Sequence, residues 1–288
     1  MSIVRGAGRT LASVGPLEWQ DRDGAWHTVP PPLASRRTWG DTDAFLRDPA
    51  GPTLAWTPRA DGLASTDLVL RRTPNPVPVT LLVLRVDPAA WTFRVWGRAD
   101  WSRASVSLLA TEAEVPVAVN AAYFTEDGPL GLVVSDGVRR SAPARHRAAH
   151  FLVRNGAPVV VNARRAALDG ASQGFQGFPS IMTAGRVYAY IRDGGRGFDV
   201  RGVNRRSAAC TTRSGHVVLL VTDTLTNGLS FSELATVLGG LGCRDAMAFD
   251  GGSSTAFVAT LPGWRRDVQG LEPVPVILGL RPRQPADR

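Results

Sequence analysis

The sequence predicts an α+β fold with a mixed, largely antiparallel β-sheet core and a few packed helices. Two observations predict it. Short apolar runs rich in β-branched residues recur from residue 79 onward, and several are joined by Asp-Gly, Asn-Gly or Ser-Gly pairs, which favour tight hairpin turns. By contrast, one segment near residue 231 has a clear helical pattern. Sheets connected by hairpins therefore dominate the expected architecture.

The strand pattern predicts four hairpins and one further strand pair. The turn pairs are Asp136-Gly137, Asn155-Gly156 and Ser214-Gly215, with Gly185 in the remaining hairpin. We also expect residues 79–86 to pair with residues 91–96 across Asp87-Pro88. The expected hairpin arms are residues 130–135 with 138–141, 151–153 with 159–161, 180–183 with 187–191, and 206–212 with 216–222.

The clear helix begins after Ser230. Ser230 and Glu233 have the spacing of a capping box, in which each side chain binds a backbone N–H at the helix start. An apolar stripe follows, and Gly242 is suited to end the helix. A second helix within residues 101–112 has a weaker pattern.

The chain divides into two parts. Residues 1–61 contain Pro30-Pro31-Pro32 and four of the eight tryptophans, with little periodicity. A disordered segment is poor in large aromatic residues, so we expect an irregular Trp/Pro-rich extension packed on the main body. Residues 62–288 form the main domain.

All 33 basic residues are arginine, and the net charge is +8. Guanidinium groups bind phosphate and carboxylate ligands in a bidentate manner. The arginines are scattered and match no nucleic-acid-binding motif, so nucleic acid is the least favoured partner. No apolar run is long enough to span a membrane, and the N-terminus lacks the layout of a signal peptide.

The sequence predicts no metal site and no cofactor. The four histidines are dispersed, and no Cys/His spacing typical of a metal site is present. Cys210 and Cys243 leave two alternatives open: a disulfide, which would indicate an oxidising compartment, or two buried thiols. We favour the thiols.

A carboxylate on a glycine turn is the most informative local feature. Asp250-Gly251-Gly252-Ser253-Ser254 follows the short apolar strand of residues 246–249. The glycines let backbone N–H groups approach a ligand closely, and the serine hydroxyls can donate or accept hydrogen bonds.

Three segments in this order resemble the phosphodiester glycosidase family over residues 62–282. They are residues 119–137, residues 204–208, and residues 221–230 with the turn at residues 250–254. The chain departs from the family pattern at Ala121 or Ala122 and at Cys210, where glycine is usual. It also has Asp223-Thr224 where the family often has Asp-Gly. The resemblance implies a carbohydrate or sugar-phosphate substrate and an exported protein of bacterial type, while a cytoplasmic location stays open.

The expected chemistry assigns roles to the motif residues. Arg206 would bind the substrate phosphate and stabilise its developing charge. Asp250 would act at the anomeric carbon as nucleophile or as base for water, and Asn120 completes the catalytic group. A second carboxylate is not identified, although Glu126 and Asp127 are candidates. The expected substrate-binding residues are Tyr123, Ser254, Gly251, Gly252 and Asp223.

The sequence therefore predicts a glycoside hydrolase that cleaves a sugar-1-phosphodiester or a related glycosidic linkage. Two alternatives remain open: a non-catalytic glycan-binding module on the same scaffold, and an arginine-rich nucleic-acid binder. The sugar, the stereochemical outcome and the oligomeric state are not determined by the sequence.

Overall fold

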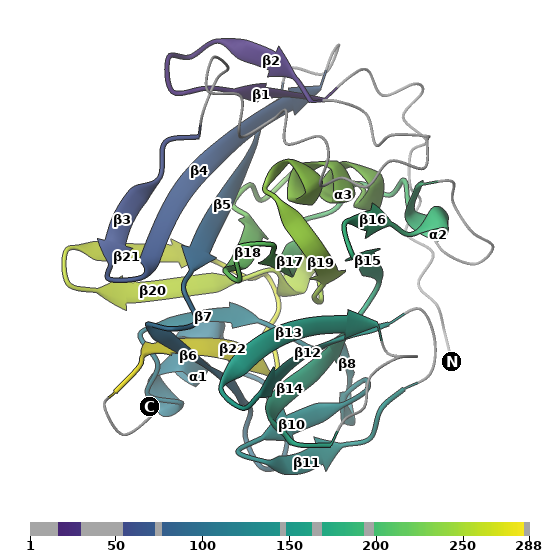
Figure 1. Ribbon diagram of the computed structural model, residues 1–288. Coiled ribbons are helices and arrows are strands. Elements are labelled where there is room, and N and C mark those ends of the chain that lie inside the picture. Colours follow the sequence, from purple (N-terminus) through teal and green to yellow (C-terminus); the bar gives the residue numbers. More distant parts are fainter. Residues whose placement is uncertain are drawn as a thin grey trace.

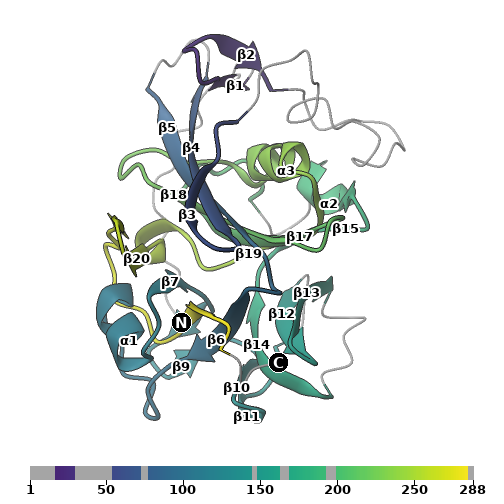
Figure 2. The same cartoon turned by 60° about the vertical axis from the view of Figure 1, so that its left-hand side comes forward.

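The computed structural model describes residues 17–29, 54–72, 77–144, 148–162, 169–192 and 199–284. Three β-sheets and a two-stranded ribbon make up most of these residues, and every strand pair among them is antiparallel. The largest sheet occupies the upper half of the molecule and the two smaller sheets lie below it (Figures 1 and 2). The predicted α+β class is confirmed.

The upper sheet has ten strands, in the order β16-β15-β19-β17-β18-β5-β4-β1-β2, and β3 also pairs with β4. The described parts of residues 1–61 thus include strands that join the edge of this sheet. The strands are β1 (Leu17–Gln20), β2 (Trp26–Thr28), β3 (Thr57–Ala60), β4 (Leu63–Arg72), β5 (Val79–Val86), β15 (Ser180–Thr183), β16 (Arg186–Val187), β17 (Ser207–Thr212), β18 (Val217–Thr222) and β19 (Cys243–Ala248).

The lower sheets have five strands each, in the orders β11-β10-β14-β12-β13 and β21-β20-β7-β22-β6, and β8 pairs with β9. Their strands are β6 (Trp91–Trp96), β7 (Val117–Asn120), β8 (Phe124–Thr125), β9 (Gly128–Pro129), β10 (Val133–Ser135), β11 (Val138–Ser141), β12 (Ala149–Arg154), β13 (Ala157–Asn162), β14 (Ala171–Gly177), β20 (Phe257–Leu261), β21 (Trp264–Val268) and β22 (Ile277–Pro282).

The helices cover the outer faces of the sheets. Helix α3 (Phe231–Gly240) and the short α2 (Ala189–Arg192) lie over the upper sheet, and α1 (Val106–Glu112) packs beside β7 below (Figure 2). A 3₁₀ turn, Gly252–Ser254, follows β19. The predicted capping box of α3 is present. In the described residues, no helix is long and apolar enough to cross a membrane.

Strand β5 separates the two largest cores. Leu82 and Leu84 pack in the core between the upper and lower sheets, whereas Leu81 and Val83 pack in the core beneath α3. Both faces of β5 are therefore buried, which agrees with its nearly continuous apolar sequence.

The hairpins at Asp136-Gly137, Asn155-Gly156 and Ser214-Gly215 form as predicted. The hairpin at Gly185 forms too, but its second arm is only β16, and α2 follows directly. The predicted pairing of residues 79–86 with 91–96 is wrong. β5 is occupied on both edges by β4 and β18, so β6 pairs with β22 in a lower sheet instead.

The two cysteines form a disulfide, contrary to the favoured alternative of buried thiols. Cys210 on β17 and Cys243 on β19 are bonded, with a Cα–Cα distance of 5.6 Å. The pairing of β17 with β19 brings the two residues together, because Cys210 faces Ala246 and Thr212 faces Cys243 across the ladder. Both sulfurs lie within the core beneath α3.

Candidate functional site

Strand register brings three of the predicted site residues to one edge of the upper sheet. Arg206 precedes β17, Asp223 follows β18, and Asp250 lies just beyond β19. The neighbouring pairs Ser207–Val221 and Ala208–Ala248 fix this alignment. In antiparallel neighbours the start of one strand lies beside the end of the next. Residues far apart in the sequence therefore meet at this edge.

Asn120 connects this edge to the lower sheet that contains β7. Its Nδ2 donates to the backbone oxygen of Asp250 at 2.7 Å, and its Oδ1 accepts from Ser207 Oγ at 2.6 Å and from the Ala256 N–H at 3.2 Å. The side chain is completely buried. Since protein atoms occupy both ends of the amide, Asn120 orients the backbone of Asp250.

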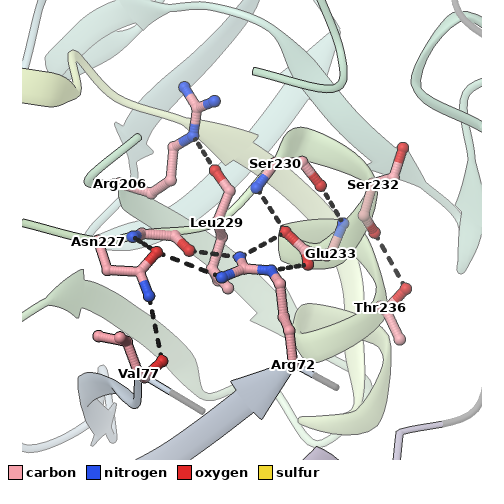
Figure 3. Close-up of polar contacts among 10 residues, drawn as sticks. Arg72, Val77, Arg206, Asn227, Leu229, Ser230, Ser232, Glu233 and Thr236 are labelled. Carbon is pink, nitrogen blue, oxygen red and sulfur yellow. Dashed lines mark hydrogen bonds and ion pairs between the residues drawn. The ribbon is translucent and has the colours of Figure 1, made fainter. Parts of the chain in front are cut away.

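Arg206 is held on three sides. Its Nε donates to the carbonyl of Leu229 at 2.8 Å (Figure 3), its Nη2 donates to Gly202 at 2.7 Å, and its Cζ lies 3.7 Å from the centre of the Phe231 ring. Its Nη1 makes no hydrogen bond within the described residues. A Cβ on Gly251 would lie 3.8 Å from this nitrogen. The guanidinium group thus directs its free edge toward the glycine turn.

Arg206 remains a cation at neutral pH. Burial lowers its pKa to about 10, and the negative groups Asp199 and Glu233 oppose that shift. A buried, immobilised cation interacts more strongly with a ligand anion than a solvated one does, because the surroundings screen the charge less.

Asp250 has a strongly perturbed carboxyl group. Burial raises its pKa from 3.8 to about 6, while hydrogen bonds from the Ser254 side chain and the Gly251 N–H oppose the shift. The negative charge of Glu272 raises the pKa further. A carboxyl group that titrates near neutrality in such surroundings is typical of a catalytic acid or base.

Tyr123 lies close enough to interact electrostatically with both Asp250 and Arg206. Burial and the charge of Asp250 raise the pKa of its hydroxyl above the usual range, and Arg206 acts in the opposite direction. The hydroxyl therefore stays protonated and can donate a hydrogen bond. The ring packs edge-on against Phe178, with 6.4 Å between the ring centres.

The two glycines after Asp250 are required by space and by backbone conformation. A Cβ on Gly251 would lie 2.8 Å from the carbonyl oxygen of Arg205, and Gly252 has a φ of +64°. The Gly252 N–H donates to the same carbonyl at 2.9 Å. The turn therefore packs directly on the segment that carries Arg206.

Asp223 lies at the same edge but is bound elsewhere. Its carboxylate accepts a short hydrogen bond from Arg266 of β21, which also binds Asp67 at 3.0 Å. The structure thus gathers Asp250, Arg206, Tyr123, Ser254 and the two glycines, with Asn120 behind them, and it places the Asp223 carboxylate in an ion pair with β21.

The sequence profile of the phosphodiester glycosidases matches residues 113–281, more than half of the chain. The chain belongs to the phosphodiester glycosidase family. No curated protein matches the sequence significantly.

Solved structures share the phosphodiester glycosidase fold. The zebrafish N-acetylglucosamine-1-phosphodiester α-N-acetylglucosaminidase catalytic domain, auto-inhibited by its pro-peptide, is 18% identical with a TM-score of 0.60, over 88% of this chain and 98% of that one. A hypothetical protein from Synechocystis is 15% identical with a TM-score of 0.60, over 81% of this chain and 64% of that one. A putative exported protein from Burkholderia pseudomallei is 15% identical with a TM-score of 0.50, over 74% and 76% of the two chains.

Glu272 is the site residue that the sequence did not reveal. Its Oε2 accepts a hydrogen bond from Ser253 Oγ at 2.8 Å, and its backbone N–H donates to the Ser253 carbonyl at 3.1 Å. Its Oε1 lies 3.5 Å from Arg103 Nη1, and it also lines a cavity of about 380 Å³ that Asp250 and Arg206 do not line. Glu272 lies in a loop before β22 with no motif around it, so the sequence offered no signal. Glu126 and Asp127 instead lie exposed at the tip of the β8–β9 ribbon.

No group of three or more His, Cys, Asp or Glu side chains in the described part of the chain is arranged to hold a metal ion.

Proposed function

We propose that this phosphodiester glycosidase hydrolyses a sugar-1-phosphodiester or a closely related glycosidic linkage. One observation carries the proposal: the partly buried Asp250 carboxyl group, whose pKa is raised to about 6, and the Arg206 Nη1, which makes no hydrogen bond within the described residues, lie at the same glycine turn. A phosphodiester linked to C1 of a sugar needs these two functions, a cation for the phosphate and a carboxylate for the sugar.

In the proposed reaction, the bond between C1 and the phosphate oxygen breaks, and C1 receives the hydroxyl group of water, either directly or by hydrolysis of a covalent intermediate with Asp250. The leaving phosphate is a weak base, so its departure requires little protonation. Arg206 Nη1 stabilises the negative charge that builds on it. Asp250 acts as nucleophile at C1 or as the base that takes the proton from water. The products are the free sugar and a phosphomonoester, and the proton of water ends in solution or on the phosphate.

The remaining residues support this chemistry. Tyr123 and Ser254 provide hydroxyl groups near Asp250, and Asn120 orients the Asp250 backbone. Glycoside hydrolysis commonly uses two carboxyl groups. We assign Glu272 as the second, because the hydroxyl of Ser253 holds it against the turn that carries Asp250.

We also propose that the protein is exported. The Cys210–Cys243 disulfide supports this proposal, because such bonds persist in oxidising compartments and are rare in the cytosol.

The test is hydrolysis of methyl N-acetylglucosamine-1-phosphate. This compound is an N-acetylglucosamine-1-phosphodiester, the class of substrate for which the zebrafish relative is named. The wild type should release N-acetylglucosamine and methyl phosphate. Asp250→Asn should reduce turnover by about 10²–10⁴-fold, the usual loss for an acid/base group, while substrate binding changes much less.

The matched control is Asp127→Asn, the same chemical change on an exposed hairpin carboxylate, which should retain wild-type turnover. Near-wild-type turnover of Asp250→Asn would remove Asp250 from the mechanism. Binding of sugar phosphates without hydrolysis of any phosphodiester would instead support a glycan-binding module.

A further inference from the structure

A buried ion pair lies behind the site, at the end of strand β4. Arg72 is 6% exposed. Its Nε binds Glu233 Oε1 at 2.6 Å and its Nη2 binds Glu233 Oε2 at 2.8 Å, a bidentate pair (Figure 3). Arg72 and Glu233 are 161 residues apart in sequence, so this contact ties the start of α3 to a distant strand.

The same guanidinium also binds the loop that precedes α3. Arg72 Nη2 donates to the carbonyl of Gly228 at 2.5 Å, and Nη1 donates to Asn227 Oδ1 at 3.2 Å. Asn227 Oδ1 in turn accepts from the Gly228 N–H, and its Nδ2 donates to the carbonyl of Val77. The Arg72 guanidinium therefore donates to four oxygen atoms: both carboxylate oxygens of Glu233, the amide oxygen of Asn227 and the backbone oxygen of Gly228 (Figure 3).

Glu233 fixes the other end of this loop. Its Oε2 accepts from the Ser230 N–H at 2.7 Å, and Ser230 Oγ accepts from the Glu233 N–H at 3.2 Å, which completes the capping box. The ion pair thus immobilises residues 227–230 from both sides.

This loop supplies the surroundings of Arg206. The Leu229 carbonyl accepts from Arg206 Nε, and Phe231, the next residue but one, lies under the guanidinium. The loop also packs on the segment before Arg206 without spare room: a Cβ on Gly228 would lie 1.9 Å from the Asn204 carbonyl oxygen. A small displacement of the loop would therefore move the Arg206 side chain.

We propose that Arg72 and Glu233 are positioning residues, which hold residues 227–230 so that Arg206 keeps its Nη1 aimed at the substrate phosphate. The inference rests on the proposed function for its catalytic consequence. Stability alone is a weak reason for a buried ion pair, because apolar residues of similar volume often stabilise a fold equally well. The hydrogen bonds from Arg72 and Glu233 to residues 227–230, by contrast, fix the position of the Leu229 carbonyl that binds Arg206.

The experiment uses the double variant Arg72→Met, Glu233→Gln. It removes both charges and every guanidinium donor, while glutamine at position 233 preserves the capping box. The control is Arg71→Met, Glu18→Gln, the same change in the neighbouring, more exposed ion pair that joins β4 to β1. Thermal unfolding of both variants checks that they are folded.

The first measurement is nitrogen-15 NMR of arginine side chains, with the Arg206 Nε–H resonance assigned by its absence from Arg206→Lys. In the wild type this proton should exchange slowly with solvent and carry a ring-current shift from Phe231. The double variant should exchange at least 10-fold faster and lose much of that shift, and the control should match the wild type. An unchanged resonance in a folded double variant would overturn the proposal.

The second measurement is turnover of the phosphodiester substrate. We expect kcat to fall by about 10–100-fold in the double variant, since misplacement of a catalytic group by about 1 Å costs on that order. Full turnover in the folded double variant would overturn the positioning role. If the wild type hydrolyses no phosphodiester, the proposed function fails, and the Arg206 resonance still decides whether the ion pair positions this side chain.

Discussion

At Asp250, burial and hydrogen bonding act in opposite directions on one carboxyl group. Burial raises its pKa to about 6, and two hydrogen bonds that favour the charged form reduce the shift only in part. One pH unit corresponds to about 1.4 kcal/mol, so the charged form of Asp250 is considerably less stable in the folded protein than in water. The fold is thus strained electrostatically at the position where the proposed chemistry needs a reactive carboxylate.

This environment predicts two pH dependences of opposite sign. Because the carboxylate is the reactive form, kcat/KM should rise with pH through a midpoint near 6. The stabilising contribution of Asp250 is complete below about 3.8, its unfolded value, and is lost as the pH rises through about 6. Asp250→Asn removes that loss, so at pH 8 the inactive variant should be more stable than the wild type by about 1–3 kcal/mol.

Urea unfolding at pH 5 and pH 8, with initial rates over the same interval, measures both effects. Asp127→Asn serves again as control and should change neither profile. A kcat/KM that falls through pH 6, or an Asp250→Asn variant that is less stable than the wild type at pH 8, would contradict the assignment.

The sequence predicted which residues form the site, but it did not predict which of their polar atoms stay available to bind a substrate. Asn120, Arg206 and Asp250 all adjoin strand ends, which favoured their convergence. Tertiary contacts decide that both ends of the Asn120 amide are occupied, and that Arg206 offers one edge instead of its full fork. Glu272 belongs to no motif, and only the fold brings it to Ser253.

At the scale of strands and helices, local signals predicted what local interactions control. Turns such as Asp136-Gly137 specify their own hairpins, because both residues adopt the positive φ that the turn requires. The partner of β5 depends on which edges remain free after β4 and β18 have paired with it. That competition is non-local, so the short spacing between β5 and β6 indicated the wrong pair.

The close contact between the last residue of β14 and the last residue of β19 gives a prediction at this scale. A Cβ on Gly177 would lie 2.4 Å from the Ala248 carbonyl oxygen, and this backbone leads directly into Asp250. Gly177→Ala should therefore separate the two strands, displace Phe178 from Tyr123 and lower turnover, with a loss of stability of about 1–3 kcal/mol or more from overpacking.

Gly174→Ala on the same strand is the matched control. There the nearest atom to the added Cβ, at 2.6 Å, is a methyl carbon of Leu152, which can rotate away, and the nearest backbone atom, the Phe151 carbonyl oxygen, lies at 3.0 Å instead of 2.4 Å. Denaturant unfolding and turnover should both be less affected than in Gly177→Ala. Equal turnover in the two variants would show that the contact between Gly177 and Ala248 does not position the site.

For the whole molecule, the site depends on the association of separate sheets. Asn120 of the lower sheet binds the backbone of Asp250 beyond the upper sheet, and the Asp250 N–H donates to Ala121 at 3.0 Å. The largest shared core, between these sheets, includes Phe151, Phe175 and Phe257. The site is therefore complete only when the sheets are docked against each other.

The Cys210–Cys243 disulfide joins two neighbouring strands of the upper sheet, β17 and β19. It closes a segment of 33 residues that contains β18, the loop of residues 227–230 and α3. In the chain-entropy model such a closure stabilises the fold by about 4 kcal/mol. The double variant Cys210→Ala, Cys243→Ala should therefore lower the free energy of unfolding by about 2–4 kcal/mol. Both sulfurs are buried beneath α3, away from the Asp250 carboxyl. At temperatures where the variant is folded, its kcat should stay within about twofold of the wild-type value. Mass spectrometry of the wild type with and without reductant establishes the bond, and urea unfolding under the same two conditions measures its contribution. A protein purified under oxidising conditions with two free thiols, or an unfolding midpoint that reductant does not change, would contradict both the bond and the inference of export that rests on it.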